Sequence, residues 1–176
     1  MKTGIEKFKN VINPDLCDSL ITYMDLNLPN SVNKIHDIHN NVICKEIVLP
    51  QQSDLDAAVY EVIENVIVLY KEKYSHVAYK GDTGYQLRKI TGKTSLHVDN
   101  ISSIRMPRNV SIILGLNSDY KNGKFNFPVQ NFSTTVKRGE AIVFPVYFMY
   151  PHSVDAPIGN RYTINTWMID ADTSFQ

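Results

Sequence analysis

The sequence predicts an α+β fold in which two helices precede a series of closely spaced strands. Apolar residues recur at helical spacing only in the first half of the chain, and a period of two takes over after about Tyr79. Glycine, proline, asparagine and aspartate separate the short apolar runs that follow, and such spacing favours a sandwich or a barrel. At 176 residues, without an internal repeat or a Ser/Pro-rich linker, the chain fits one domain. We expect helical support over about residues 1–80 and a β core over about residues 81–170.

The two helices are predicted from their capping residues and their apolar spacing. In NPDLCDSLITYM, Asn13 is a suitable N-cap and Pro14 suits the first helical position. Its apolar residues at helical spacing are Leu16, Leu20, Ile21 and Met24. In SDLDAAVYEVIENVIVLYKEKY, Ser53 and Asp56 occupy capping positions. The apolar residues that recur there every three or four positions are Leu55, Val59, Val62, Ile63, Val66 and Leu69.

The strands are predicted from short runs rich in Val, Ile, Phe and Tyr. The candidates are residues 85–90, 110–116, 124–127, 132–136, 141–144, a stretch that ends near His152, and Arg161–Ile169. Two loops stand beside these strands, residues 75–84 and residues 100–109. Loops in such positions are natural substrate lids.

Charge and cysteine content argue against several classes of function. Eighteen basic and eighteen acidic residues cancel, so the chain lacks the field that gathers phosphate backbones or anionic lipid. Cys17 and Cys44 are too few for a disulfide framework and lack the spacing of a thiolate metal site, which predicts reduced thiols. No apolar run reaches signal-peptide or membrane-spanning length. We expect a cytoplasmic protein with no nucleic-acid or membrane partner, and the sequence leaves its oligomeric state open.

A histidine and an aspartate stand two residues apart in SLHVDN, at His97 and Asp99. Extended backbone directs residues i and i+2 to one face, so both could reach one ion, although a surface turn capped by Asp99 would produce the same pair. His152 is the candidate third ligand because it follows strand-like sequence, whereas the remaining histidines lie in the polar first half: His36, His39 and His76. Two histidines and a carboxylate with open coordination positions bind non-haem Fe(II), while a structural zinc site would need a fourth ligand.

A candidate anion-binding residue follows the third histidine. Arg161 opens RYTINTWMI nine residues after His152, and the period of two places Thr163, Asn165 and Trp167 on the same face. The planar fork of arginine holds a carboxylate through two hydrogen bonds, and the Thr163 hydroxyl could add another. A cation beside the metal site predicts an anionic cosubstrate. Trp167 is interpreted as a core residue.

The segment YQLRKITGKTSLHVDN resembles the first metal-binding strand of the iron- and 2-oxoglutarate-dependent dioxygenase superfamily, most closely its prolyl 4-hydroxylase-like branch. VSIILGLNSDYKNGKFNFP is similar to the hairpin of that branch, and VKRGEAIVFPVYFMYPHSVDAPIGNRYTINTWM to its closing segment. The resemblance implies a double-stranded β-helix, or jelly roll, braced by the N-terminal helices. It also implies that His97, Asp99 and His152 hold Fe(II), that Arg161 binds the distal carboxylate of 2-oxoglutarate, and that Tyr85 offers a hydroxyl near this cosubstrate.

The resemblance further implies a reaction and a substrate class. A dioxygenase of this kind uses Fe(II), 2-oxoglutarate and O2, with ascorbate as a candidate reductant, to hydroxylate a C–H bond. A proline in a peptide or protein is the expected substrate; free proline, another small molecule, a nucleobase and a noncatalytic jelly-roll binding module are the alternatives.

The sequence departs from the family at two places in the hairpin. Gly115 stands where some relatives have a tyrosine that touches the cosubstrate, so Thr163 or Tyr85 would have to substitute for it. Asn122, Gly123 and Lys124 replace a usual Gly-Gly-Glu, which puts a substrate contact at the acidic position in doubt.

Overall fold

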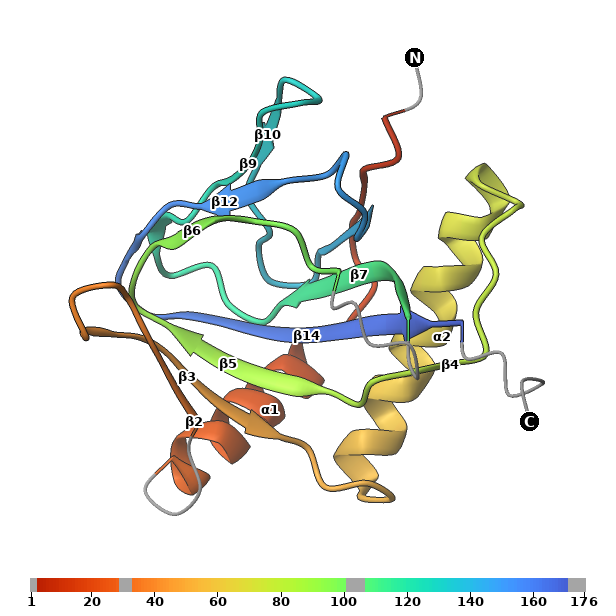
Figure 1. Ribbon diagram of the computed structural model, residues 1–176. Coiled ribbons are helices and arrows are strands. Elements are labelled where there is room, and N and C mark those ends of the chain that lie inside the picture. The colour runs from red at the N-terminus through yellow and green to blue at the C-terminus, as the bar shows by residue number, and fades with distance from the viewer. Residues whose placement is uncertain (1–2, 29–32, 101–106, 171–176) are drawn as a thin grey trace, which may run out of the picture.

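The computed structural model describes residues 3–28, 33–100 and 107–170, which Figure 1 draws in colour. The helices of this part of the chain are α1 (Pro14–Asn27) and α2 (Asp54–Lys73). Its strands are β1 (Glu6–Phe8), β2 (Asn33–His36), β3 (Val42–Val48), β4 (Gly81–Asp82), β5 (Gln86–Ile90), β6 (Thr94–His97), β7 (Arg108–Gly115), β8 (Lys121–Asn122), β9 (Phe125–Phe127), β10 (Phe132–Thr134), β11 (Ala141–Pro145), β12 (His152–Val154), β13 (Pro157–Ile158) and β14 (Arg161–Ile169).

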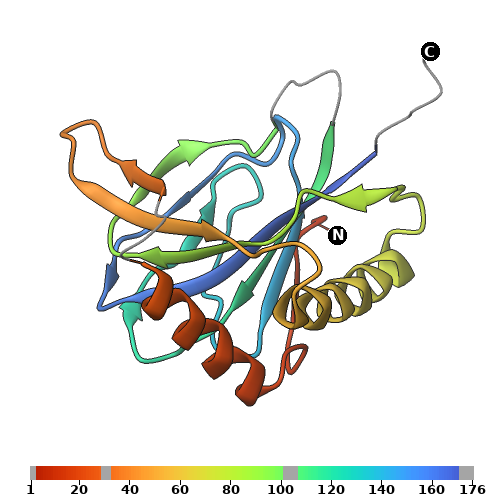
Figure 2. The same ribbon diagram turned by 90° about the horizontal axis from the view of Figure 1, so that it is seen from below.

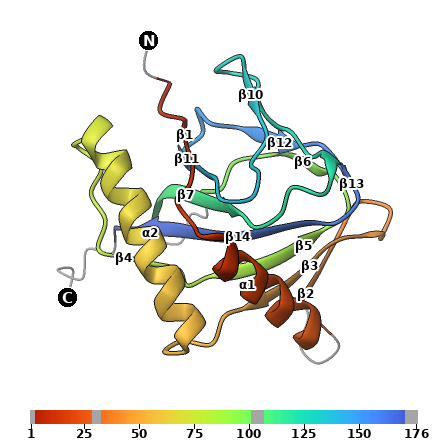
Figure 3. The ribbon, with the colours of Figure 1, turned by 180° about the vertical axis from the view of Figure 1, so that it is seen from behind.

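A larger sheet carries both helices on one face. Its strand order is β1-β11-β7-β14-β5-β3-β2, and β4 pairs with β14. Figures 2 and 3 show α1 and α2 against the same, outer face of this sheet. Helix residues such as Leu20 and Ile63 form one apolar core with strand residues such as Leu87 and Ile164. Because alternate strand residues point to opposite faces, the sequence neighbours of Leu87 and Ile164 point to the inner face of the sheet.

Both predicted helix starts are confirmed by their caps. Asn13 Oδ1 accepts a hydrogen bond of 2.7 Å from the backbone N–H of Leu16, and Pro14 is the first residue of α1. Ser53 Oγ accepts one of 3.1 Å from the N–H of Asp56 in the first turn of α2. Each cap satisfies a backbone donor that has no partner inside its helix.

The buried faces of the helices follow the predicted spacing with one exception. The buried residues of α1 are Cys17, Leu20 and Met24, and those of α2 are Val59, Ile63, Val66, Ile67 and Tyr70. Leu69, the last apolar residue of the predicted spacing, is 38% exposed and lies outside the buried face. Tyr70 fills the core beside it and donates a hydrogen bond of 2.7 Å to the Gly4 carbonyl.

A smaller sheet faces the larger one and completes the jelly roll. Its order is β10-β9-β12-β6, and β8 and β13 pair with each other. In Figure 1 this sheet lies above the larger one. A second apolar cluster includes residues of both sheets, among them Ile113, Phe125, Phe127 and Phe144. The predicted double-stranded β-helix with N-terminal helices is therefore confirmed.

Most predicted strands of the second half are confirmed. Their ends agree within two residues, and β14 has the predicted bounds. The stretch expected to end near His152 is wrong, because β12 begins at this residue. The N–H of Tyr150 donates to the Tyr147 carbonyl at 2.8 Å, and this turn separates β11 from β12.

The first half contributes strands as well as helices. β1, β2 and β3 extend the larger sheet, and β3 pairs with β5. Lys45 and Glu46 interrupt the apolar run in VICKEIV, which hides this strand in the sequence. Glu46 is nevertheless 8% exposed, because Arg88 on β5 donates a hydrogen bond to it.

The remaining predictions about loops and cysteines have different outcomes. Of the proposed lid at residues 100–109, residues 101–106 lie outside the described residues, and residues 75–84 contain the short strand β4. Cys17 and Cys44 are both free and buried, which confirms their predicted reduced state. Within the described residues, neither helix combines the length and the apolar character needed to cross a membrane.

Replacing Ser53 by alanine removes the acceptor that satisfies the Asp56 N–H. We expect S53A to lower the free energy of unfolding by about 1 kcal/mol, measured by urea denaturation followed by circular dichroism. The control is S75A, since Ser75 is exposed beyond the end of α2 and should change this free energy by less than about 0.5 kcal/mol. Equal losses in the two variants would contradict the capping role.

Candidate metal centre and its pocket

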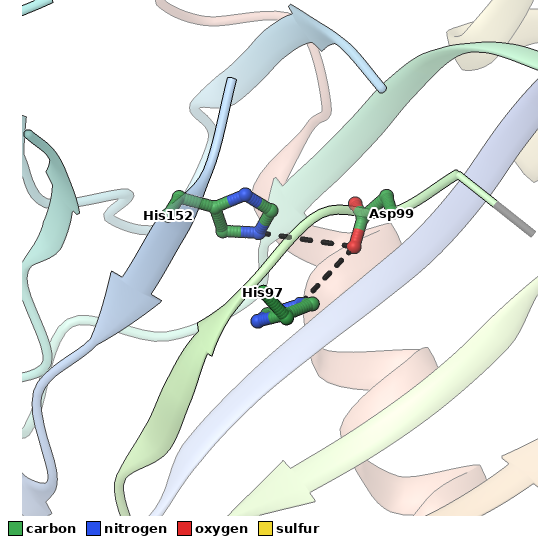
Figure 4. Close-up of side chains that lie close together, drawn as sticks. All are labelled: His97, Asp99 and His152. Atoms are coloured by element: carbon green, nitrogen blue, oxygen red, sulfur yellow. Dashed lines mark ion pairs between the residues drawn. The ribbon is translucent and has the colours of Figure 1, made fainter. Parts of the chain in front are cut away.

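The two candidate histidines lie on neighbouring strands of the smaller sheet. β6 and β12 are antiparallel, and His97 stands directly opposite His152 in their register. Side chains at opposite positions share one face of the sheet, and these two ring centroids are 4.4 Å apart. Asp99 follows just beyond the end of β6 and turns its carboxylate toward both rings (Figure 4).

Three acceptor atoms converge at this point. Asp99 Oδ1 lies 3.2 Å from His97 Nε2 and 3.8 Å from His152 Nε2. The Nδ1 of His97 is 2.8 Å from the Ser95 carbonyl, and the Nδ1 of His152 is 3.3 Å from the Tyr150 carbonyl. Since a carbonyl only accepts, a neutral ring places its hydrogen on Nδ1 and turns the Nε2 lone pair toward Asp99. Three lone pairs that face one another form a site for a cation.

The chemistry of the donor set fits Fe(II). Two imidazole nitrogens and one carboxylate oxygen on one side of an ion leave coordination positions open, as non-haem Fe(II) sites do. Among the described residues, His97, Asp99 and His152 are the one group of three such side chains whose ligand atoms lie within 4.8 Å of one another. This part of the chain supplies no fourth ligand of the kind that a structural zinc site requires.

The second oxygen of Asp99 is held by the larger sheet. Ser111 Oγ donates to Asp99 Oδ2 at 2.5 Å, and Trp167 Nε1 donates to the same oxygen at 3.2 Å. Ser111 on β7 and Trp167 on β14 are register partners, so the two donors stand side by side. They occupy Oδ2 and leave Oδ1 directed at the histidines.

The electrostatics of the three groups favour an ionised aspartate. Burial would raise the pKa of the Asp99 carboxyl, but His97, which donates through Nε2 when its ring is protonated, the positive charge of a protonated His152 and the Ser111 hydroxyl hold the pKa well below its usual range. The hydrogen bond to Asp99 raises the pKa of His97, whereas burial lowers the pKa of His152. Asp99 is therefore charged at neutral pH, as a metal ligand must be.

Arg161 lines the same cavity, which has a volume of about 90 Å³. The residue is 3% exposed; its Nη1 donates to the Gly123 carbonyl at 3.0 Å, and its Nε has no hydrogen-bond partner in the described part of the chain. None of the ion pairs among the described residues includes Arg161, and burial lowers its pKa to about 10. A buried guanidinium without an acidic partner is costly, so the site suits an anionic ligand.

The turn between β8 and β9 supports Arg161. Asn122 and Gly123 have φ values of 62° and 70°, in the left-handed region that asparagine and glycine adopt more readily than other residues. A β-carbon at Gly123 would lie 3.0 Å from the ring of Tyr120, which is a tight contact, and 3.5 Å from Arg161 Cδ, which is an ordinary one, so a larger residue would press on the Tyr120 ring beside Arg161. Although Asn122, Gly123 and Lys124 differ from the usual Gly-Gly-Glu, Gly123 still provides the carbonyl that accepts a hydrogen bond from Arg161.

Close packing of the backbone explains why this chain has Gly115 where some relatives have a tyrosine. A β-carbon on Gly115 would overlap the carbonyl of Lys137, because the backbone passes directly over this position. The space that a tyrosine would need is filled by the backbone itself. Any hydroxyl that assists Arg161 must come from another residue.

Thr163 lies on the inner face of β14 beside Arg161. It is fully buried, and its Oγ1 donates to Asn165 Oδ1 at 2.8 Å. Asn165 lines the cavity together with Arg161. Thr163 therefore lies next to the cavity wall, and its hydroxyl is engaged with Asn165.

The expectation for Tyr85 is corrected by its position. Tyr85 is 3% exposed in the apolar core between the larger sheet and the helices, and its hydroxyl donates to Asp82 Oδ2 at 2.8 Å. The residues of β5 that line the cavity are Arg88 and Ile90. Since alternate residues of a strand face opposite sides, Tyr85 belongs to the outer face together with Leu87, away from the cavity.

Sequence reasoning misses the roles of three residues at this site: Ser111 and Trp167, which donate to Asp99, and Arg88, which lines the cavity. Ser111 is a polar residue inside the apolar strand NVSIILG, which is the one sequence signal of its role. Trp167 is 5% exposed, which confirms its predicted burial, and its indole N–H also donates to Asp99, which the sequence does not indicate. Arg88 was not singled out in YQLRKI, and its guanidinium contacts the cavity.

Comparison with known proteins agrees with this geometry. Residues 85–169 match the family model described as the 2OG-Fe(II) oxygenase superfamily. No curated protein is similar enough in sequence to be recognised as a relative.

Several solved structures share the fold at low sequence identity. A prolyl hydroxylase from Trichoplax adhaerens, in complex with a hypoxia inducible factor oxygen degradation domain peptide fragment, has a TM-score of 0.77 at 15% identity, covering 99% of this chain and 89% of that one. A viral collagen prolyl hydroxylase from Paramecium Bursaria Chlorella virus-1, in a 2OG complex, has a TM-score of 0.74 at 14% identity and covers 95% and 96%. A Pseudomonas putida prolyl-4-hydroxylase has a TM-score of 0.71 at 17% identity and covers 94% and 92%.

Removing His152 should abolish tight metal binding, because one of the three converging lone pairs is lost. We expect H152A to bind Mn(II) at least about tenfold more weakly than the unmodified chain, measured by isothermal titration calorimetry without oxygen. His39 lies in an exposed turn outside the site, so H39A should bind Mn(II) normally. Unchanged affinity in H152A would exclude His152 as a ligand.

Ser111 should act as a positioning residue for Asp99. We expect S111A to weaken Mn(II) binding about tenfold, because Asp99 Oδ2 loses a donor and the carboxylate is free to turn. The matched control is T166V, which removes a buried hydroxyl that has no hydrogen-bond partner among the described residues. If both variants bind Mn(II) like the unmodified chain, the hydroxyl of Ser111 does not orient the ligand.

Proposed function

We propose that this dioxygenase hydroxylates a proline residue of a peptide or protein, and the match of residues 85–169 to the 2OG-Fe(II) oxygenase superfamily supports the proposal. One observation carries the proposal: three metal-ligand atoms and the guanidinium of Arg161 line the same cavity. Arg161 is buried and has no acidic partner among the described residues. A cation site next to an anion site suits a metal together with a cosubstrate that carries two carboxylates.

The chain's own residues would hold the two groups at opposite ends of the cavity. His97 Nε2, His152 Nε2 and Asp99 Oδ1 would bind Fe(II), and Arg161 would bind the distal carboxylate of 2-oxoglutarate. When bound, Fe(II) and 2-oxoglutarate supply the oxidising chemistry: one oxygen atom of O2 enters the C–H bond, and the other appears in succinate as CO2 leaves. Arg161 is already desolvated, so its hydrogen bonds to a carboxylate would be strong and directional.

Other side chains would orient and shield the reacting groups. Ser111 and Trp167 hold Asp99 Oδ2, which keeps the carboxylate from turning away from the metal position. Ile113 and Phe125 line the cavity with apolar surface and limit the access of water. Thr163 supports the cosubstrate only indirectly in this proposal, by fixing Asn165 beside Arg161.

The proline substrate is supported by the similar solved structures. Each of the three is a prolyl hydroxylase, and one is a complex with a peptide fragment. We further propose that the chain works as one domain, in the cytoplasm, with ascorbate as reductant. The alternatives are an oxygenase that acts on a free amino acid, on another small molecule or on a nucleobase. Identifying the hydroxylated compound distinguishes them from the proposed function.

The direct test incubates the chain with Fe(II), 2-oxoglutarate, ascorbate and air, and with a library of proline peptides blocked at both ends. We expect succinate release in step with the gain of one oxygen atom on a proline, detected by mass spectrometry. Activity on free L-proline alone, or on a nucleobase alone, would replace the proposed substrate. Absence of succinate formation with every compound would instead favour a noncatalytic binding module.

The role of Arg161 has a separate test. We expect R161M to raise the KM for 2-oxoglutarate by about ten- to a hundredfold, because charged hydrogen bonds to the distal carboxylate are lost. The control is R138M, since Arg138 pairs with Asp18 at the surface. A KM unchanged by R161M would show that the cosubstrate is anchored elsewhere.

A further inference from the structure

Arg88 is a second guanidinium in the cavity, and two hydrogen bonds fix its position. Its Nε donates to Glu46 Oε2 at 2.6 Å, and its Nη2 donates to Gln86 Oε1 at 2.7 Å. Glu46 and Arg88 are register partners on β3 and β5, so the pair spans two strands of the inner face. A side chain held in this way has already lost the rotamer freedom that ligand binding would otherwise cost.

Arg88 lies in the same cavity as the candidate metal centre, which it lines together with His97 and Asp99. Its Cζ is 5.6 Å from the ring centroid of Trp167, and Trp167 in turn donates to Asp99. A group that Arg88 binds would therefore lie close to the reacting centre.

One nitrogen of Arg88 remains available to a ligand. Nη1 of Arg88 makes no hydrogen bond among the described residues. The buried polar atoms that lack a partner do not include Nη1, so this nitrogen is accessible to solvent. The side chain keeps 21% of its surface exposed. Its two free N–H donors thus face solvent-accessible space in a preorganised position.

The charges around Arg88 select the kind of acceptor. Glu46 already neutralises the guanidinium through an ion pair of 2.6 Å. In the proposed function, Arg161 is neutralised by the distal carboxylate of the cosubstrate. Because Glu46 already compensates the charge of Arg88, a substrate carboxylate would gain little net attraction there and would add an unbalanced negative charge, whereas a neutral carbonyl oxygen would accept the free N–H donors without adding charge.

We propose that Arg88 donates through Nη1 to a backbone carbonyl of the substrate, and that Glu46 excludes a free carboxylate from this position. The pair thereby selects a residue inside a peptide over a free amino acid. This inference rests on the proposed function and specifies its substrate class.

The test measures binding without turnover, on the chain loaded with Mn(II) and 2-oxoglutarate. Two probes are compared: a blocked proline peptide that the chain hydroxylates in the library experiment, and free L-proline. Isothermal titration calorimetry gives the dissociation constant of each. We expect R88Q to weaken peptide binding by about tenfold or more. The dissociation constant of 2-oxoglutarate should stay unchanged in R88Q, which also shows that the pocket is intact.

Two further variants separate charge from geometry. Lys89 is the matched control, because it is a cation on the same strand that pairs with Asp25 on the outer face; K89Q should bind the peptide normally. E46Q keeps an acceptor for Arg88 but removes the negative charge. We expect it to shift the ratio of the two dissociation constants about tenfold in favour of free L-proline.

The outcomes distinguish this inference from the proposed function. Normal peptide binding by R88Q, or tighter binding of free L-proline than of the peptide by the unmodified chain, would overturn the role of Arg88 while proline hydroxylation stands. If no peptide of the library is hydroxylated or bound, the proposed function fails, and the role of Arg88 fails with it.

Discussion

The candidate centre depends on the antiparallel pairing of β6 with β12. This pairing sets His97 opposite His152 and brings together residues that are far apart in the sequence. Asp99 completes the set because the chain continues past the end of β6 toward the larger sheet, where Ser111 and Trp167 hold one carboxylate oxygen. The smaller sheet thus supplies the histidines, and the larger sheet fixes the angle of the aspartate between them.

A second constraint is the burial of Arg161 without an acidic partner among the described residues. The folded chain tolerates this cation because the Gly123 carbonyl accepts one hydrogen bond and the ring of Phe125 lies 5.0 Å from the guanidinium carbon. Neither contact neutralises the charge, so a carboxylate ligand would stabilise the fold as well as bind to it. Arg88 differs, because Glu46 neutralises it within the chain. The cavity therefore has one guanidinium suited to an anion and another suited to a neutral acceptor.

The sequence predicts the parts of this arrangement that local patterns encode. The caps at Asn13 and Ser53 and the period of two in β14 are local, and each agrees with the structure. The burial of Trp167 agrees with the sequence, but the hydrogen bond of its indole N–H to Asp99 is not predicted, because the two residues lie 68 positions apart. β3 was missed for a similar reason: Glu46 looks like a break in a strand until Arg88 of β5 is placed opposite to it. The expected position of Tyr85 beside the cosubstrate is wrong because a shift of one residue along a strand moves a side chain to the opposite face of the sheet.

A crystal structure of the chain grown with Mn(II) and 2-oxoglutarate would test the metal and cosubstrate positions directly. We expect anomalous density for the metal between His97 Nε2, Asp99 Oδ1 and His152 Nε2, with one carboxylate of 2-oxoglutarate against the guanidinium of Arg161. Metal bound at any other group of side chains, or a cosubstrate that leaves Arg161 without a carboxylate, would contradict this expectation.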